Sequence, residues 1–217
     1  MKYHLMHPRK AFNKLNYYIE LASRFEEIYI KGVYQLLYDS IRPGTTVLDI
    51  GAAIGDTAIY FAMNPNAKKV ISYEPFPRAF SLLLQNTRKY PKIECKQLAI
   101  GKHQIKHIKD KKSYGINYDS EEGSTGEKIE SITLAEALKG LTNVVIKSDC
   151  EGAEGYMFND ADLSEVYAIQ LEYHNNRGDT VSSLEKKGFK IIQEDNPLPD
   201  IYGRCPKGFG TIFAKKM

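Results

Sequence analysis

Val47-Leu48-Asp49-Ile50-Gly51-Ala52-Ala53-Ile54-Gly55-Asp56-Thr57 is the stretch that decides the fold of this chain. It begins as an apolar strand, turns at two glycines and ends in residues that suit the start of a helix. The next apolar stretch ends in Ser72-Tyr73-Glu74-Pro75, which places an acid about 20 residues after the turn. Glycines let the backbone approach a ligand closely, a helix N-terminus offers N–H groups to an anion, and such an acid can bind ribose hydroxyls. Together these residues predict a site for a nucleoside cofactor.

The spacing of the glycines distinguishes between two classes of cofactor-binding site. A dinucleotide fingerprint reads Gly-x-Gly-x-x-Gly, and its second glycine makes room for the pyrophosphate. Ala53 stands at that second position here, which disfavours an NAD-dependent oxidoreductase without removing it as an alternative. The run instead reads Asp-x-Gly-x-x-x-Gly through Asp49, Gly51 and Gly55, and it resembles motif I of the class I S-adenosylmethionine-dependent methyltransferases. The resemblance implies that this loop holds the methionine half of S-adenosyl-L-methionine and that Glu74 binds the ribose.

The rest of the chain alternates short β-rich segments with helical patterns, which is typical of a doubly wound sheet. We predict an α/β fold with a Rossmann-like, doubly wound, seven-stranded and mostly parallel sheet. The predicted strands lie near residues 45–50, 69–74, 93–98, 143–148, 166–173, 188–194 and 209–215. One predicted helix is capped by Asp56 or Thr57 and reaches Met63, another runs from Pro77 to about Lys89, and a third runs from Ile132 to Leu138.

Two segments flank or interrupt this core. Apolar and aromatic residues at helical spacing over 11–40 predict an N-terminal helical extension, residues 1–43, that packs on a methyltransferase domain formed by residues 44–217. Gly32 is a possible break in it. The tyrosines of the extension can line the mouth of an acceptor pocket, but helix packing against the sheet is the favoured explanation for them. The polar stretch at about 101–128 predicts an inserted strand pair and a mobile loop.

Composition and charge narrow the function classes. The 217 residues suit one domain, and 42% hydrophobic with 26% charged residues is ordinary globular usage. No apolar run approaches the length needed to cross a bilayer and no signal-like segment opens the chain, so we expect a cytoplasmic protein with no membrane partner. The net charge of +3 is too small to predict a nucleic-acid partner. Three widely spaced cysteines indicate reduced thiols, and nothing in the sequence predicts the oligomeric state.

A second group of polar residues follows the strand predicted at 143–148. Asp149, Glu151 and Glu154 come directly after it. Ligands of open α/β sheets bind beyond the carboxyl ends of the strands, where the strand order reverses, here between the first and fourth strands. We therefore expect Asp149 to face the glycine loop.

The run Ile146-Lys147-Ser148-Asp149-Cys150-Glu151-Gly152-Ala153-Glu154 resembles the Lys-x-Asp-x-Glu-Gly-x-Glu signature of the FkbM family of methyltransferases. Glu74-Pro75 and Leu171-Glu172-Tyr173-His174 are similar to two further features of that family, and the resemblance spans roughly residues 44–215. It implies methyl transfer, commonly to a hydroxyl oxygen of a sugar or natural product, so the expected partner is a small-molecule or glycan acceptor. A non-catalytic module that only binds the cofactor is the alternative from another class. The cofactor-binding residues implied by the resemblance are Asp49, Gly51, Ala52, Gly55, Asp56, Thr57, Glu74, Pro75, Ala99 and Asp149.

Transfer to a hydroxyl needs a base that removes a proton as the new bond forms. His174 and Asp149 are the candidates, the first for its ordinary pKa and the second for its place beside the glycine loop. The alternative for His174 is a surface histidine after a strand. The acids Asp149, Glu151, Glu154 and Glu172 can instead bind magnesium, although we predict no metal, and Glu151 and Glu154 can cap the following helix.

Overall fold

The computed structural model describes residues 25–102, 104–110, 120–123, 127–150, 153–195 and 208–216. Its main sheet has seven strands in the order β10-β11-β9-β8-β1-β2-β3. β3, β2, β1, β8 and β9 run parallel, and β11 is antiparallel to both of its neighbours. The α/β fold and the seven-stranded, mostly parallel sheet predicted from the sequence are confirmed. The strand bounds are β1 Thr45–Ile50, β2 Ala67–Tyr73, β3 Ile93–Lys96, β8 Val144–Ser148, β9 Val166–His174, β10 Phe189–Asp195 and β11 Phe209–Lys216.

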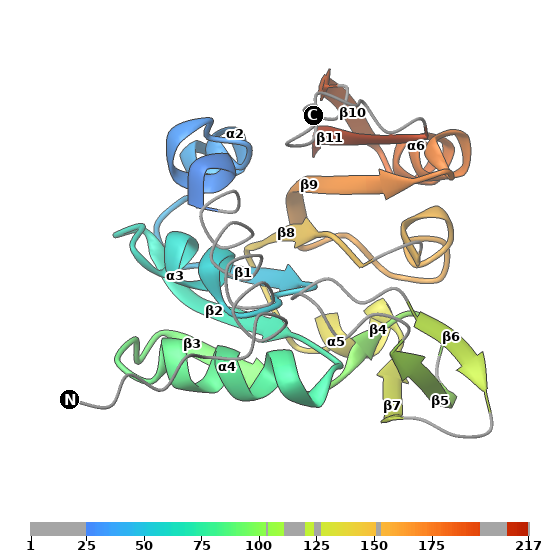
Figure 1. Ribbon diagram of the computed structural model, residues 1–217. Helices are drawn as coiled ribbons and strands as arrows, with labels where there is room; N and C mark the ends of the chain where they lie inside the picture. The colour runs from blue at the N-terminus through green and yellow to red at the C-terminus, as the bar shows by residue number, and fades with distance from the viewer. Residues whose placement is uncertain are drawn as a thin grey trace.

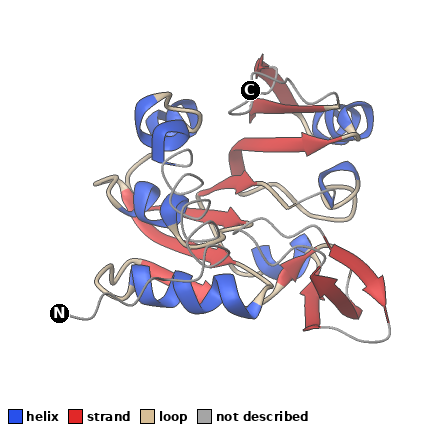
Figure 2. Ribbon diagram, viewed as in Figure 1, coloured by secondary structure: helices blue, strands red, loops and turns tan. Residues whose placement is uncertain are grey.

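Helices cover both faces of this sheet, so its central strands are buried on both sides (Figure 2). On one face pack the π-helical turn η1 (Glu26–Ile30) and the helices α2 (Gln35–Ser40), α3 (Asp56–Ala62) and α4 (Pro77–Thr87). On the other face pack α5 (Leu134–Leu138), the short 3-10 helix η2 (Ala153–Gly155) and α6 (Arg177–Lys186). Every residue of β1 and of β8 is buried. No helix in the described part of the chain combines the length and the apolar character that crossing a membrane requires.

The helix ends show how local chemistry sets the boundaries. Pro77 occupies the first turn of α4, as predicted. Thr133 and Glu136 form a reciprocal capping box at the start of α5, so the helix begins at Leu134 and not at Ile132, which ends a strand. The predicted cap of α3 by Asp56 or Thr57 is also wrong. Its N-cap is Gly55, whose φ of 94° lets the chain turn sharply from the loop into the helix.

The described part of the N-terminal extension contains the two short helical elements η1 and α2. Gly32 lies between them with a φ of 65°, and this left-handed conformation ends the first element, as the sequence suggested. Residues 1–24, the first part of the predicted extension, lie outside the described residues.

A second, smaller sheet interrupts the core between β3 and α5, and it projects beside α5 at the lower right of Figure 1. Its order is β4-β7-β5-β6, with bounds β4 Ala99–Ile100, β5 Gln104–Asp110, β6 Ser120–Gly123 and β7 Glu127–Ile132. The sequence predicted only a strand pair in this region, whereas β7 and β4 extend the β5–β6 pair to a sheet of four strands. The predicted third strand of the core is shorter for the same reason: it ends at Lys96, and the next strand residues, Ala99 and Ile100, pair with β7.

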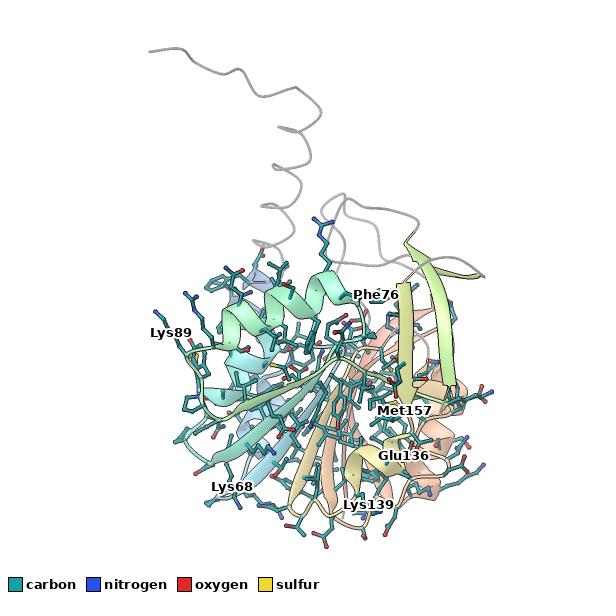
Figure 3. All side chains as sticks on the ribbon, turned by 90° about the horizontal axis from the view of Figure 1, so that it is seen from below. Lys68, Phe76, Lys89, Glu136, Lys139 and Met157 are labelled. Atoms are coloured by element: carbon teal, nitrogen blue, oxygen red, sulfur yellow. The ribbon has the colours of Figure 1, made fainter. Side chains whose placement is uncertain are left out.

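The strands β3, β2, β1, β8 and β9 all end at the same edge of the main sheet. In Figure 3, Phe76, which follows β2 and precedes α4, lies toward this edge, and Lys68 and Lys139 lie toward the opposite edge. β1 lies between β8 and β2, so the strand order reverses at the β1–β8 pair. The glycine loop after β1 and Asp149 after β8 are therefore neighbours at the switch point, which is where doubly wound folds bind their ligands.

Candidate active site

The glycine loop after β1 packs directly on the backbone after β8. Gly51 has a φ of 75°, and a Cβ added to it would lie 1.8 Å from the carbonyl oxygen of Asp149. The N–H of Asp149 donates to the carbonyl oxygen of Ile50 at 3.0 Å. Only glycine fits at position 51, and the structure places Asp149 against the loop, where the sequence analysis expected it.

The loop itself is held by backbone hydrogen bonds. The N–H groups of Gly51 and Ala52 both donate to the carbonyl oxygen of Tyr73, each at 3.0 Å. Ala53 follows with a φ of 45°, an uncommon conformation for a residue with a side chain. Gly55 then closes the turn against α4, where an added Cβ would lie 2.8 Å from Leu83 Cδ1.

Asp49, Thr57 and Asp56 brace this loop from the protein side. Asp49 is fully buried, and its Oδ2 accepts a 2.9 Å hydrogen bond from Thr57 Oγ1, which ties the end of β1 to the first turn of α3. Asp56 Oδ1 accepts from the N–H of Thr57 at 3.0 Å. The three residues form the base of the cradle, and they support the loop's shape.

Glu74 directly follows the neighbouring strand, β2, and its carboxylate is buried. Its Oε2 accepts from the N–H of Ala53 at 2.9 Å and its Oε1 from the N–H of Phe76 at 2.9 Å. Each carboxylate oxygen has more than one lone-pair site, so both can accept further hydrogen bonds from a diol. Pro75 lies half-buried between Glu74 and Phe76. A cradle that only glycine can form, next to a buried acid fixed at both oxygens, fits the amino-acid and ribose parts of S-adenosylmethionine.

Ala99 lies in β4, where it pairs with Ser131 of the small sheet. It is half-buried and belongs to the segment that leaves the main sheet after β3. The role of Ala99 in binding the cofactor stays a prediction.

His174 ends β9 and lies among three carboxylates. Its Nε2 is 3.8 Å from Asp149 Oδ1 and 3.8 Å from Glu172 Oε1, while its Nδ1 is 3.6 Å from Glu154 Oε1. The side chain is only 9% exposed, and the ring of Phe209 meets it edge to face with centroids 5.1 Å apart. The alternative reading of His174 as a surface histidine is therefore wrong. These separations are longer than ordinary hydrogen bonds, so the pairing with the carboxylates is electrostatic and strengthens when the imidazole is protonated.

Glu154 is the most deeply buried of the three acids, with no exposed area. Its Oε1 accepts from the N–H of Cys150 at 2.9 Å and from Cys150 Sγ at 3.1 Å. Burial by itself would raise the pKa of Glu154, but His174 and the donors of Cys150 outweigh burial and lower it. η2 is a single 3-10 turn, and the carboxylate of Glu154 turns toward His174 and Cys150. Glu151, the other acid proposed as a cap, lies outside the described residues.

The same environment makes Cys150 a poor nucleophile. Burial, with Glu154 beside the sulfur, raises the pKa of the Cys150 thiol well above its usual value. Within the described ranges, no three His, Cys, Asp or Glu side chains are arranged to hold a metal ion.

Lys147 lies against the glycine loop, although its place in the sequence predicted no particular role. Its side chain is 2% exposed, its Nζ donates to the carbonyl oxygens of Ile50 at 3.2 Å and Gly51 at 2.8 Å, and it lies 3.3 Å from Asp49 Oδ1. Burial acts to lower the pKa of Lys147, but the nearby aspartates, led by Asp49, raise it above its ordinary value. The feature of the sequence that could have indicated a role is the position of this charged residue in a buried strand, directly after the three apolar residues that begin Val144–Ser148.

Comparison with known proteins agrees with this geometry. The family model of the methyltransferase FkbM domain matches residues 49–191. No curated protein matches the sequence significantly. Among solved structures, the fold is similar to that of a fibrillarin pre-rRNA processing protein of Methanococcus jannaschii, with a TM-score of 0.51, 14% identity, and coverage of 81% of this chain and 68% of that chain.

Two further structures have the same fold. TrmK of M. capricolum, in complex with S-adenosyl-homocysteine, matches with a TM-score of 0.51, 14% identity, and coverage of 84% of this chain and 66% of that chain. A protein of the NADB-Rossmann superfamily from Streptococcus agalactiae matches with a TM-score of 0.50, 16% identity, and coverage of 85% and 68%. At these identities the likeness shows the fold alone, whereas the family model matches about two thirds of the chain. The chain therefore belongs to the FkbM family of methyltransferases, which use S-adenosylmethionine as the methyl donor.

Proposed function

We propose that this protein is an O-methyltransferase that acts on a hydroxyl group of an uncharged small molecule or glycan. The observation that carries the proposal is the position of His174, buried among carboxylates at the carboxyl end of β9, next to Asp149 and so next to the glycine loop. S-adenosylmethionine, when bound, supplies a methyl group already activated by a sulfonium. The protein has to bind the two substrates, align them and accept a proton.

The glycine loop and Glu74 would hold the methyl donor. Gly51, Ala52 and Gly55 shape the cradle, Asp49, Asp56 and Thr57 support it, and Glu74 with Pro75 receives the ribose. Positioning two reactants in this way accounts for several kcal/mol of a displacement barrier, in the range of about 7–11 kcal/mol for well-aligned systems.

His174 is the proposed general base. Nε2 would accept the hydroxyl proton of the acceptor as the hydroxyl oxygen bonds to the methyl carbon and the bond from that carbon to the sulfonium sulfur breaks, with the sulfur keeping the bonding electrons. Glu154, fixed beside Nδ1, stabilises the imidazolium that results and keeps the ring in one orientation. A general base of this kind contributes roughly 100- to 10,000-fold in rate. Asp149 and Glu172, on the Nε2 side, orient the acceptor by accepting hydrogen bonds from its hydroxyl groups. Direct proton removal by Asp149 is the alternative assignment.

The charge around His174 bears on the class of acceptor. Asp149, Glu154 and Glu172 place three carboxyl groups around one imidazole. Such a site repels phosphate groups and suits a neutral polyol or a cationic group. This supports a glycan or small-molecule acceptor over RNA, although TrmK and fibrillarin share the fold. The N-terminal extension and the insertion near 101–128 are proposed to complete the acceptor pocket.

Transfer of a tritiated methyl group from S-adenosylmethionine tests the proposal. A panel of neutral glycans and hydroxylated natural products is compared with tRNA and with primary amines. The expected product is an alkali-stable methyl ether on a neutral acceptor. His174→Ala should lower kcat by roughly 100-fold or more, while the affinity for S-adenosylhomocysteine stays close to that of the parent protein. Transfer only to RNA or to nitrogen, or full activity in both His174→Ala and Asp149→Asn, would refute the proposal.

A further inference from the structure

Asp49, Lys147 and Gln170 form a polar row across the middle of the apolar sheet. Asp49 is in register with Lys147 on β8, and Lys147 is in register with Gln170 on β9. Side chains in register on adjacent strands point to the same face of a sheet. All three residues are almost completely buried, and their neighbours two positions earlier, Val47, Val145 and Ala168, belong to the apolar cluster under the N-terminal segment and α3.

The stability of the fold does not by itself explain why polar residues occupy these three buried positions. Removing charges from water is costly, and a buried ion pair can often be replaced by apolar residues without loss of stability. Val145 and Ala168 show that the same face of β8 and β9 packs well with apolar side chains. The position of the charged groups, and not their contribution to stability, is what distinguishes this part of the sheet.

The ammonium group of Lys147 is directed at the start of the glycine loop. The carbonyl oxygens that accept from Nζ belong to Ile50 and Gly51, the last residue of β1 and the first residue of the turn. Asp49, which pairs with the same ammonium, also accepts from Thr57 at the other end of the loop. Lys147 therefore connects both ends of the loop from the side that faces the core.

The part of the N-terminal segment around Tyr34 packs over Lys147 and Gln170. Lys147 Nζ lies 5.7 Å from the centre of the Tyr34 ring. On either side of Tyr34 in sequence, Gln170 holds the backbone: its Nε2 donates to the carbonyl oxygen of Val33, and its Oε1 accepts from the N–H of Leu37 at 3.2 Å. Excluding water in this way strengthens the electrostatic contacts of a buried charge. The family model begins at residue 49, so the cover comes from a part of the chain outside the match.

We propose that Lys147 is a positioning residue for the methyl donor, and that the segment around Tyr34, docked through Gln170, seals Lys147 in place so that the Gly51 loop keeps its binding shape. The lysine acts through the backbone of the loop. The proposal concerns cofactor binding alone and needs no acceptor, so it stands or falls independently of the O-methyl assignment.

Titration of the full chain with S-adenosylhomocysteine by calorimetry tests the role of Lys147. Lys147→Met removes the donors, and the expected rise in Kd is about tenfold or more, the size expected for losing hydrogen bonds from a charged group. The matched control is Lys187→Met, because Lys187 Nζ also donates to a backbone carbonyl, that of Ala161 at 2.8 Å. We expect its Kd to stay within about twofold of the parent value.

Lys147→Met leaves Asp49 as an unpaired buried acid, which can prevent folding. The double variant Asp49→Asn/Lys147→Met removes both charges and keeps a side-chain oxygen for Thr57. If the pair is only structural, the double variant recovers both urea stability and affinity. If Lys147 positions the loop, the double variant recovers stability while its Kd stays about tenfold or more above that of the single variant Asp49→Asn. A double variant with parental affinity overturns the proposal.

Gln170→Met tests the cover separately. This length-matched change removes both contacts to the N-terminal segment and leaves Lys147 and the loop unchanged. We expect faster proteolysis of the chain between residues 25 and 41 together with weaker binding of S-adenosylhomocysteine. Faster proteolysis with unchanged affinity would overturn the sealing role.

Discussion

The hydroxyl of Tyr29 donates a 3.2 Å hydrogen bond to the backbone carbonyl oxygen of Asp56, at the start of α3. The bond joins the N-terminal segment to the residue that follows the glycine loop, across 27 positions of sequence. Tyr60 packs against the ring of Tyr29 edge to face with centroids 5.4 Å apart. The segment before β1 is therefore attached to the cofactor side of the sheet by specific polar and aromatic contacts.

We expect the protein to lose stability at alkaline pH as the hydroxyl of Tyr29 ionises. Burial, with Asp56 nearby, raises the pKa of Tyr29 from 10.0 to about 12. A group with a raised folded-state pKa stabilises the protein fully below its unfolded pKa, and this contribution is lost as pH rises from about 10 toward 12. Urea unfolding should show a steeper decline in this window for the parent than for Tyr29→Phe. Equal slopes would mean that the Tyr29 contact makes no difference to alkaline stability.

Gly51→Ala should be far more damaging than an alanine at a comparable glycine. Gly51 and Gly140 have nearly the same φ, 75° and 74°, but a Cβ at Gly51 would meet the Asp149 carbonyl oxygen at 1.8 Å, whereas a Cβ at Gly140 has no atom within 4 Å. Gly140→Ala should cost only the left-handed strain, about 1–2 kcal/mol. Gly51→Ala should cost at least about 2 kcal/mol more, or prevent folding, because backbone has to move. Equal losses in the two variants, measured by urea unfolding, would contradict the close approach of the two loops.

Glu74→Gln should weaken binding of S-adenosylhomocysteine. The change keeps the size of the side chain but removes the charge that strengthens hydrogen bonds to a ribose diol. We expect Kd to rise about tenfold or more. Glu94→Gln is the control, since Glu94 lies on the next strand and pairs with the partly exposed Lys69 and Lys96. A result in which both variants bind like the parent would remove Glu74 from the cofactor site.

Glu154→Gln should shift the pH dependence of turnover. A general base acts when deprotonated, and the neighbouring carboxylate favours the protonated imidazole. Removing the charge of Glu154 should therefore move the rise in kcat with pH to lower pH and reduce the maximum rate. Glu154→Asp, which keeps the charge, should restore the parental midpoint at least in part. A reduced rate with an unmoved midpoint would indicate that Glu154 only supports the fold near Cys150.

The patterns that predicted the fold are local ones. The strand Val144–Ser148 is predicted by the apolar run of its first three residues, and the site at Gly51 and Glu74 by the spacing of these residues in the sequence. The sequence could not show that Ile132 extends a small sheet, since its strand partner Ile100 lies 32 positions away. The role of Lys147 was hidden for the same reason, because its partners Asp49 and Gln170 come from other strands and from opposite directions along the chain.

The two ends of the segment that forms the small sheet pair with each other at the point where the chain leaves the core. Ala99 and Ile100 pair with Ser131 and Ile132, and the N–H of Gly101 donates to the carbonyl oxygen of Ile132 at 2.8 Å. The strand that leaves the core is thus paired with the strand that returns to it. Lengthening the chain between them raises the entropic cost of closing the loop only slowly. Insertions and deletions there need not disturb the glycine loop or Asp149. On the proposed function, in which this insertion helps to form the acceptor pocket, the module can be exchanged to change the acceptor while the residues proposed to hold the methyl donor stay the same.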